Sequence, residues 1–417
     1  MPIFDRSALL AVALSTGPLS VLAHGLIGAG RAFTAALLVG SATLLAVFGR
    51  WRKFRFSALD VAFALFACAV VASFWWNGYG GDRKELYLLA ISIASYPAAR
   101  GLAGSMPGRG FVIASALIVV LGSVATLAAL IAQWDASGKP FVFGIYETAP
   151  AQFMSTLVFL MIALACTKYG ALRAATVSAV LAVPLVIFAA SMVRSTFIGA
   201  AAAIAVAMWR SGSGKQRRKA TMILASLLIA LALGLAIRSD VSVRYIGFAA
   251  ATLTGRPDSD FVRETTDPTR KTYRMTQAVD GCPEIFSQNT LAIRKQLYVD
   301  ALSLLPAAGL FGIGMDRFTE RSCIIGHGVH NTILQVAIEL GWPAAVLLVA
   351  MIIASLAFLW PMARSDQEMR FVLCGLIFVV VMSMGHGRIS REGALFLFLG
   401  YAAAVQQRSI YKPSATF

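Results

Sequence analysis

Long apolar runs separated by short polar segments recur along most of the chain. Runs of the roughly 17 to 25 residues that cross a bilayer predict spanning helices, at 8–29, 33–49, 56–76, 86–104, 111–133, 150–167, 172–193, 195–209, 220–237, 342–360, 371–385 and 393–407. Hydrophobic residues make up 58% of the sequence, more than a water-soluble fold of this length can bury. The pattern predicts an all-α polytopic membrane protein with about 12 transmembrane helices.

A single long polar stretch, residues 238–329, interrupts this series. It carries eleven Lys and Arg against ten Asp and Glu, and this near neutrality predicts a folded external element, not a basic tail. Residues 263–287 predict irregular chain, whereas the apolar spacing over 293–305 predicts a helix lying against the membrane face. The chain therefore divides into transmembrane helices 1–9 (1–237), a partly helical periplasmic loop (238–329) and the closing helices (330–417).

The distribution of Lys and Arg sets the expected orientation, because short cytoplasmic loops carry the excess of these residues. With the N-terminus inside, nearly all of them fall in the cytoplasm. The net charge of +16 thus reports membrane orientation, and we do not expect nucleic-acid binding. Both termini are predicted to be cytoplasmic. The residues that set this orientation are Arg50, Arg52, Lys53, Arg55, Arg100, Arg109, Lys168, Arg173, Arg210, Lys215, Arg217, Arg218, Lys219, Arg364, Arg370, Arg408 and Lys412.

The five cysteines fall into two groups. Cys68, Cys166 and Cys374 lie inside predicted spans, where we interpret them as small buried apolar residues. Cys282 and Cys323 share the external loop, and an oxidising periplasm permits a disulfide between them. The sequence leaves that pairing open, because it does not establish that the two Cβ atoms meet.

Several common signatures are missing from the sequence. It contains no Gly-Lys-Ser/Thr phosphate loop, no Cys-x-x-Cys pair and no His-Glu-x-x-His zinc pattern. The acidic residues expected on the outer face are scattered, so no metal site is predicted there. An ATP-driven pump and a zinc protease are both unsupported, and we expect no cofactor.

A polar edge follows the end of the external stretch. Asn331 is a natural N-cap for a helix that ends at Gly341. Steps of four residues lead from Asn331 to Gln335 and Glu339, which share one face of an otherwise apolar helix. Such a stripe beside a membrane normally faces a cavity or the protein interior.

Two of the four histidines lie where the external stretch meets the helix that Asn331 caps. His330 directly precedes the cap residue, and His327 lies three residues before His330. An imidazole titrating near neutrality can accept a proton from a hydroxyl. His24 and His386 fall near or within predicted spans, and we interpret both as packing residues.

Cations on the outer face depart from the charge bias of the rest of the chain. Arg194, Arg388 and Arg391 lie in short external turns, and Arg294 begins the predicted external helix. Lys84 lies at the outer start of another helix. Guanidinium groups at this depth are typical of an anionic ligand, above all phosphate, which they bind through paired hydrogen bonds. Contact with lipid headgroups is the simpler alternative.

These residues together resemble the O-antigen ligase and polymerase superfamily of bacterial inner-membrane proteins, and most closely the O-antigen ligases. The resemblance rests on the helix layout with one large loop, on Arg194, and on Arg294 followed by Gly312-Ile-Gly314, His330-Asn331, Leu334, Glu339 and Gly341. One departure is that some relatives carry a second histidine two positions before the His-Asn pair, where this chain has Gly328.

The resemblance implies a helical membrane glycosyltransferase similar to the C-type enzymes. It would transfer glycan from undecaprenyl diphosphate to a sugar hydroxyl of lipid A core on the periplasmic face of the inner membrane. The implied catalytic residues are His330, Arg194 and Arg294, in an inverting reaction without metal or nucleotide sugar. The implied substrate-binding residues are Arg388, Arg391, His327, Asn331, Glu339 and Lys84.

Other functions remain open at this point. An O-antigen polymerase or a protein O-oligosaccharyltransferase would use the same glycan substrate and the same base, with a different acceptor. A secondary transporter predicts charges near the bilayer centre and inverted repeats, whereas here the charges gather on one face and no repeat is found. A structural scaffold explains neither His330 nor the outer arginines.

Overall fold

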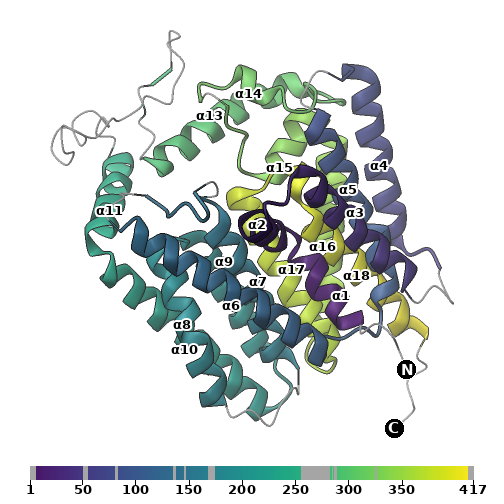
Figure 1. Ribbon diagram of the computed structural model, residues 1–417. Coiled ribbons are helices and arrows are strands. Elements are labelled where there is room, and N and C mark those ends of the chain that lie inside the picture. Colours follow the sequence, from purple (N-terminus) through teal and green to yellow (C-terminus); the bar gives the residue numbers. More distant parts are fainter. Residues whose placement is uncertain are drawn as a thin grey trace.

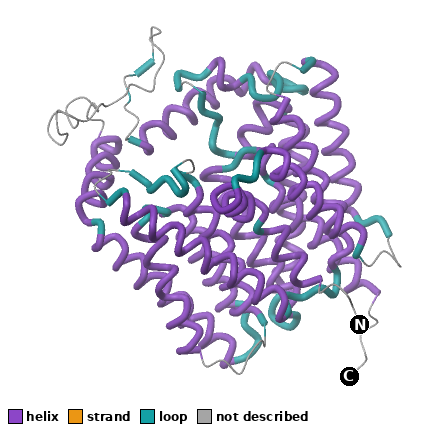
Figure 2. Tube along the Cα trace, in the orientation of Figure 1, coloured by secondary structure: helices purple, strands orange, loops and turns teal. Residues whose placement is uncertain are grey.

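The computed structural model describes residues 6–49, 55–79, 83–134, 138–144, 147–167, 174–254, 282–283, 285, 289–324 and 326–411. Every helix or strand element assigned within these residues is a helix (Figures 1 and 2). The irregular chain predicted at 263–287 lies almost entirely outside the described residues. The predicted all-α class is therefore confirmed for the part of the chain that the structure describes.

The helices follow one another with few long breaks. In chain order they are α1 (Arg6–Leu14), α2 (Thr16–Ile27), α3 (Arg31–Val47), α4 (Ala58–Asn77), α5 (Arg83–Ala99), η1 (Arg100–Leu102), α6 (Arg109–Ala132), α7 (Ala149–Cys166), α8 (Ala174–Ala190), α9 (Arg194–Trp209), α10 (Gly214–Ile237), α11 (Ser239–Thr254), α13 (Thr290–Ala308), α14 (Phe318–Arg321), α15 (Thr332–Gln335), η2 (Val336–Leu340), α16 (Trp342–Met362), α17 (Gln367–His386), η3 (Ile389–Arg391) and α18 (Gly393–Tyr411).

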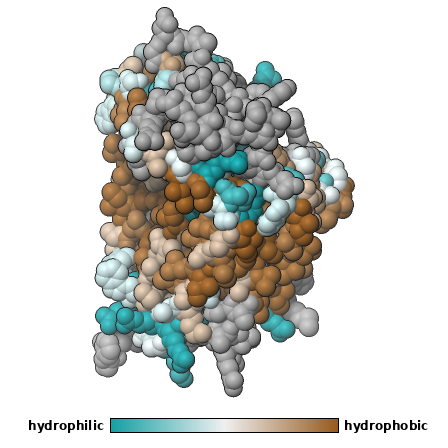
Figure 3. Space-filling view, turned by 90° about the vertical axis from the view of Figure 1, so that its left-hand side faces the viewer, coloured by the Kyte–Doolittle hydropathy of each residue, from teal (hydrophilic) through white to brown (hydrophobic). Residues whose placement is uncertain are grey.

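Six of the described helices are long and apolar enough to cross a membrane: α4, α6, α7, α10, α16 and α17. The count of twelve spans is not confirmed. The run predicted at 8–29 is broken into α1 and α2, which meet at 74° and bring the count to seven if they form one span. α3 and α9 are apolar but shorter. A brown hydrophobic band crosses the middle of the face in Figure 3, with hydrophilic residues at its lower edge.

Contacts between helix ends place the first and last described helices at one end of the molecule. Ser7 at the start of α1 accepts a hydrogen bond from the backbone N–H of Phe111 in the first turn of α6. Glu368 in the first turn of α17 accepts from the N–H of Gly104, and it forms an ion pair with Arg408 near the end of α18. The opposite end is covered by α13 and α14 (Figure 1).

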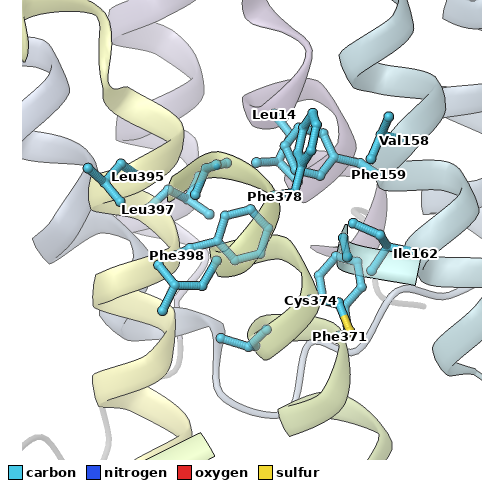
Figure 4. Packing of buried hydrophobic residues seen from close by; sticks show 14 of the residues in the cluster. Leu14, Val158, Phe159, Ile162, Phe371, Cys374, Phe378, Leu395, Leu397 and Phe398 are labelled. Atoms are coloured by element: carbon cyan, nitrogen blue, oxygen red, sulfur yellow. The ribbon is translucent and has the colours of Figure 1, made fainter. Parts of the chain in front are cut away.

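The core lies around α7, whose side chains are almost all buried. Phe159 of α7 meets Phe378 of α17 edge-on, with ring centroids 5.3 Å apart (Figure 4). Phe398 of α18 packs 6.0 Å from Phe371 of α17. Cys166 and Cys374 are buried here as predicted, but Cys68 is exposed. Cys68 lies on α4, which turns much of its apolar surface outward, so the interpretation of this cysteine as buried was wrong.

The segment predicted to be external, residues 238–329, is closed by an internal disulfide in its described part and is attached to the following helices by backbone hydrogen bonds. A disulfide joins Cys282 to Cys323 and encloses the whole of α13. After α13, the backbone N–H groups of Ile313 and Gly314 donate to the carbonyls of Ile338 and Glu339 at 2.8 and 3.1 Å. At Gly312, φ is 71° and a Cβ would overlap the backbone of Glu339. The helix predicted over 293–305 is confirmed as α13.

Candidate functional site

A cavity of about 490 Å³ lies between the helical core and the external segment. Its walls come from the loop before α7, the start of α9, the loop 326–330, and the end of α17 with the turn that follows it. Its charged and imidazole lining residues are Lys139, Arg194, His327, His330, His386, Arg388, Arg391 and Glu392. We call this space the cationic cavity.

His330 occupies an unusual backbone position in the wall of this cavity. Its φ is 57°, a left-handed conformation that costs free energy for a residue with a Cβ and that is often found at functional sites. Its imidazole forms no hydrogen bond with the residues that the structure describes, and the ring centroid of His327 lies 6.0 Å from its own. Burial, and next the charge of Arg294, lower the pKa of His330 to about 4. The ring is therefore neutral at pH 7 and can accept a proton.

Arg194 is the first residue of α9 and lines the cavity. The turn that presents it includes Met192, whose φ is 62°. Its guanidinium lies over the ring of Tyr245 in α11, 4.1 Å from the ring centroid. Within the described part of the chain it has no carboxylate partner, so the positive charge is held by a cation–π contact that leaves its N–H groups available to an anion.

Arg294 reaches the same region from α13, in the external segment. One of its terminal nitrogens lies 2.6 Å from Nε2 of His386, the last residue of α17. Burial lowers the pKa of Arg294, yet an arginine keeps its charge at neutral pH. No salt bridge to Arg294 is found among the described residues. The guanidinium charges of Arg194 and Arg294 are therefore not offset by any neighbouring acidic residue in the part of the chain that the structure describes.

Lys139 adds a third cation from the loop between α6 and α7. Two hydrogen bonds of 2.9 Å between the Gln133 amide and the backbone of Phe141 hold this loop in place. Lys139 lies between those two anchors and lines the cavity. Burial lowers its pKa; Glu147 opposes this shift, and Arg294 and Arg194 add to it. Cations that lower one another's pKa favour an anionic occupant.

Arg388 and Arg391 also line the cavity, but both are paired with acids. Arg388 forms an ion pair with Asp316 and lies 3.4 Å from a carboxylate oxygen of Glu85. Arg391 lies 3.0 Å from the other oxygen of Glu85. Ser390 donates a further hydrogen bond to Glu85. These two arginines therefore fix the turn after α17 against α5, in addition to bordering the cavity.

The polar edge predicted after Asn331 is present and points inward. Asn331 caps α15 by accepting from the N–H of Leu334 at 3.1 Å. Gln335 lines the cavity and donates to Glu339 at 2.8 Å, within the π-helical segment η2. Glu339 is 1% exposed, and burial raises its pKa to about 7. Asn331 and Glu339 therefore support the wall of the cationic cavity from behind, without lining it.

Lys84 does not line the cationic cavity. It borders an adjoining, mainly apolar cavity of about 510 Å³ between α1, α2, α3, α5, α7, α17 and α18. The two cavities share five residues in their walls: Gln152, Ser155, Met382, Arg391 and Glu392. Burial raises the pKa of Glu392, which accepts 2.7 Å hydrogen bonds from Thr332 and Ser383. An apolar space therefore opens beside a cationic one.

Sequence reasoning missed two residues of this site. His386 was interpreted as a packing histidine, yet it lines the cavity and contacts Arg294. Lys139 was not singled out, although the expected orientation places its loop on the outer face with the other cations. No group of three His, Cys, Asp or Glu side chains suited to a metal ion occurs in the residues that the structure describes.

Apolar helices of spanning length, together with a cavity lined by several cations near one end of the helices, define an integral membrane protein with a candidate anion-binding site. Residues 177–349, about two fifths of the chain, match the family model described as O-antigen ligase. The match confirms the resemblance to the O-antigen ligase superfamily, and it covers Arg194, Arg294 and His330. No significant match was found among curated proteins or among solved structures.

Proposed function

We propose that this protein is an O-antigen ligase. It transfers glycan from undecaprenyl diphosphate to a sugar hydroxyl of lipid A core on the periplasmic face of the inner membrane. The observation that carries the proposal is the cationic cavity, where a neutral histidine without a described hydrogen-bond partner faces a group of cations. The O-antigen ligase match over 177–349 supports the same reaction class.

The cations have a defined task in this reaction. The lipid-linked glycan is already activated by its diphosphate leaving group, so the site needs to stabilise departing negative charge. Arg194 and Lys139 in the cavity wall, and Arg294 beside the wall through its contact with His386, supply N–H groups and positive charge for the phosphate oxygens. Electrostatic stabilisation of this kind in a partly desolvated site is usually the largest contribution to catalysis. Because cationic side chains fill this role, we expect transfer to survive chelation with EDTA.

His330 is the proposed general base. The acceptor hydroxyl attacks the anomeric carbon, its proton passes to the neutral imidazole of His330, and the bond from that carbon to the phosphate oxygen breaks. The products are the glycosylated acceptor and undecaprenyl diphosphate. Attack from the side opposite the leaving group inverts the configuration at the anomeric carbon. His327, Arg388 and Arg391 are proposed to contact the substrates, since all three line the cavity.

The adjoining apolar cavity fits the lipid part of the same substrate. More than half of its lining residues are apolar, and it meets the cationic cavity at Gln152, Ser155, Met382, Arg391 and Glu392. A polyprenyl chain lying in the first cavity would bring its diphosphate to the second. Lys84, in the wall of the apolar cavity, is proposed to approach the lipid phosphate from that side.

The test is transfer by the purified protein in detergent, offered undecaprenyl-diphosphate-linked glycan together with lipid A core. We expect glycan on the core with wild-type protein and none with His330→Ala. Glycan lengthened on undecaprenyl diphosphate, with the core unmodified, would instead make the protein a polymerase. Transfer to a periplasmic protein would make it a protein O-oligosaccharyltransferase. Absence of transfer to every acceptor would refute the proposal.

A further inference from the structure

His386 makes the closest polar contact to a proposed catalytic cation. It is the last residue of α17, and its Nε2 lies 2.6 Å from a terminal nitrogen of Arg294. The hydroxyl oxygen of Ser195, the second residue of α9, lies 3.4 Å from the same Nε2. Three helices that are distant in the sequence thus meet at one ring nitrogen.

The chemistry of the pair fixes the direction of the hydrogen bond. A guanidinium can only donate, so Nε2 of His386 must accept, and the neutral ring carries its proton on Nδ1. The lone pair of Nε2 is thereby occupied by Arg294. His386 is consequently unsuited to act as the base, in contrast to His330, whose ring forms no hydrogen bond with the described part of the chain.

The position of the Arg294 guanidinium depends on its contact with His386, because the other hydrogen bond that docks its helix does not reach the guanidinium. Its helix, α13, belongs to the external segment, and the other described hydrogen bond between α13 and α17 is that from the Tyr298 hydroxyl to the Met384 carbonyl, 3.0 Å. That bond docks the helix but does not touch the guanidinium. An arginine side chain has several rotatable bonds, so docking the helix alone does not fix the position of its charged end.

We propose that His386, which lines the cationic cavity, is a positioning residue that holds the Arg294 guanidinium beside that cavity, with Ser195 bordering the same nitrogen. One terminal nitrogen of Arg294 is engaged with His386, and the remaining N–H groups stay available for phosphate oxygens. The inference rests on the proposed function, because it assigns Arg294 to the lipid diphosphate.

The experiment compares four single variants and one double variant of the full chain, using undecaprenyl diphosphate as the binding probe and glycan transfer as the second measurement. His386→Leu removes the acceptor, and His386→Gln replaces it with an amide oxygen of similar reach. Tyr298→Phe is the matched control, because it removes the other described hydrogen bond between α13 and α17. Arg294→Ala, alone and combined with His386→Leu, completes a double-mutant cycle.

We expect His386→Leu to weaken binding of undecaprenyl diphosphate roughly 10- to 100-fold, as for loss of a hydrogen bond to a charged group. His386→Gln should restore most of that loss, and Tyr298→Phe should stay close to wild type. In the Arg294→Ala background, His386→Leu should add little. Thermal unfolding of each variant checks that the fold is retained.

Three results would overturn the inference. The first is wild-type binding in His386→Leu. The second is a full additional loss when His386→Leu is combined with Arg294→Ala. The third is a Tyr298→Phe defect as large as that of His386→Leu, which would assign the effect to docking of α13. Wild-type protein that does not bind undecaprenyl diphosphate would overturn the proposed function as well, whereas the first three results leave that function standing.

Discussion

The pH dependence of transfer should reveal how the cavity holds His330 neutral. The perturbation is a change of pH from 8 to 4 in the transfer assay. Burial, and then the charges of Arg294, His327, Arg388 and Lys139, lower the pKa of His330 to about 4, against about 6.5 for an unperturbed histidine. Protonation removes the base, so activity is lost as the pH falls through the pKa of this residue.

The expected size of the effect follows from those two values. At pH 5.5, an imidazole with a pKa of about 4 is roughly 97% neutral, whereas one with a pKa of about 6.5 is only about 9% neutral. At pH 5.5, the fraction of free enzyme with a neutral His330 therefore differs about tenfold between a pKa of about 4 and a pKa of about 6.5. Transfer at low concentrations of the lipid-linked glycan, which measures kcat/KM, should therefore stay nearly constant from pH 8 down to about 5.

Binding of the diphosphate should raise the pH below which activity is lost. The bound anion offsets the cations that disfavour a protonated His330, so its pKa rises in the complex. The diphosphate of the lipid-linked glycan is a diester, with no proton that titrates in this range. Transfer at saturating substrate, which measures kcat, should thus fall at a higher pH than kcat/KM does.

Initial rates between pH 4 and 8 at low and at saturating substrate provide the assay, with thermal unfolding at each pH as the control for stability. An acid limb of kcat/KM near pH 6.5 would refute the argument that burial and neighbouring cations keep the imidazole neutral. If kcat falls at the same pH as kcat/KM, or at a lower pH, the placement of the diphosphate beside these cations is refuted.

Three further predictions concern single contacts. Arg194→Ala should lower transfer about 10²- to 10³-fold, as for other losses of an electrostatic contact to developing charge, while the apparent melting temperature stays unchanged; wild-type rates would remove Arg194 from the site. Cys282→Ser opens the disulfide to Cys323 and should destabilise the external segment by about 4 kcal/mol of loop-closure entropy, which limited proteolysis would detect as faster cleavage; equal cleavage rates would contradict it. Asp60→Ala leaves the guanidinium of Arg100 buried without its 2.8 Å carboxylate partner, and should cost about 3 to 5 kcal/mol, seen as a lower melting temperature in detergent; an unchanged one would show that water reaches Arg100.

The sequence by itself determined the local features of this protein. Apolar runs of sufficient length became α4, α6, α7, α10, α16 and α17, and the apolar spacing over 293–305 became α13. Asn331 caps its helix as expected, because a cap is a contact between neighbours in the chain. The cations expected on the outer face were also apparent, since Arg194 and Arg388 break the charge bias of the predicted loops.

The tertiary structure alone decided which of these residues meet. Arg294 and His386 are 92 positions apart and touch at 2.6 Å, so nothing in the local sequence of α17 distinguishes His386 from a packing histidine. Arg388 carries the same charge as Arg194 but is paired with Asp316 and Glu85. The break between α1 and α2, and the pairing of Cys282 with Cys323, were likewise undetermined. Hydropathy and capping act over a few residues, whereas such pairings depend on how packed helices bring remote segments together.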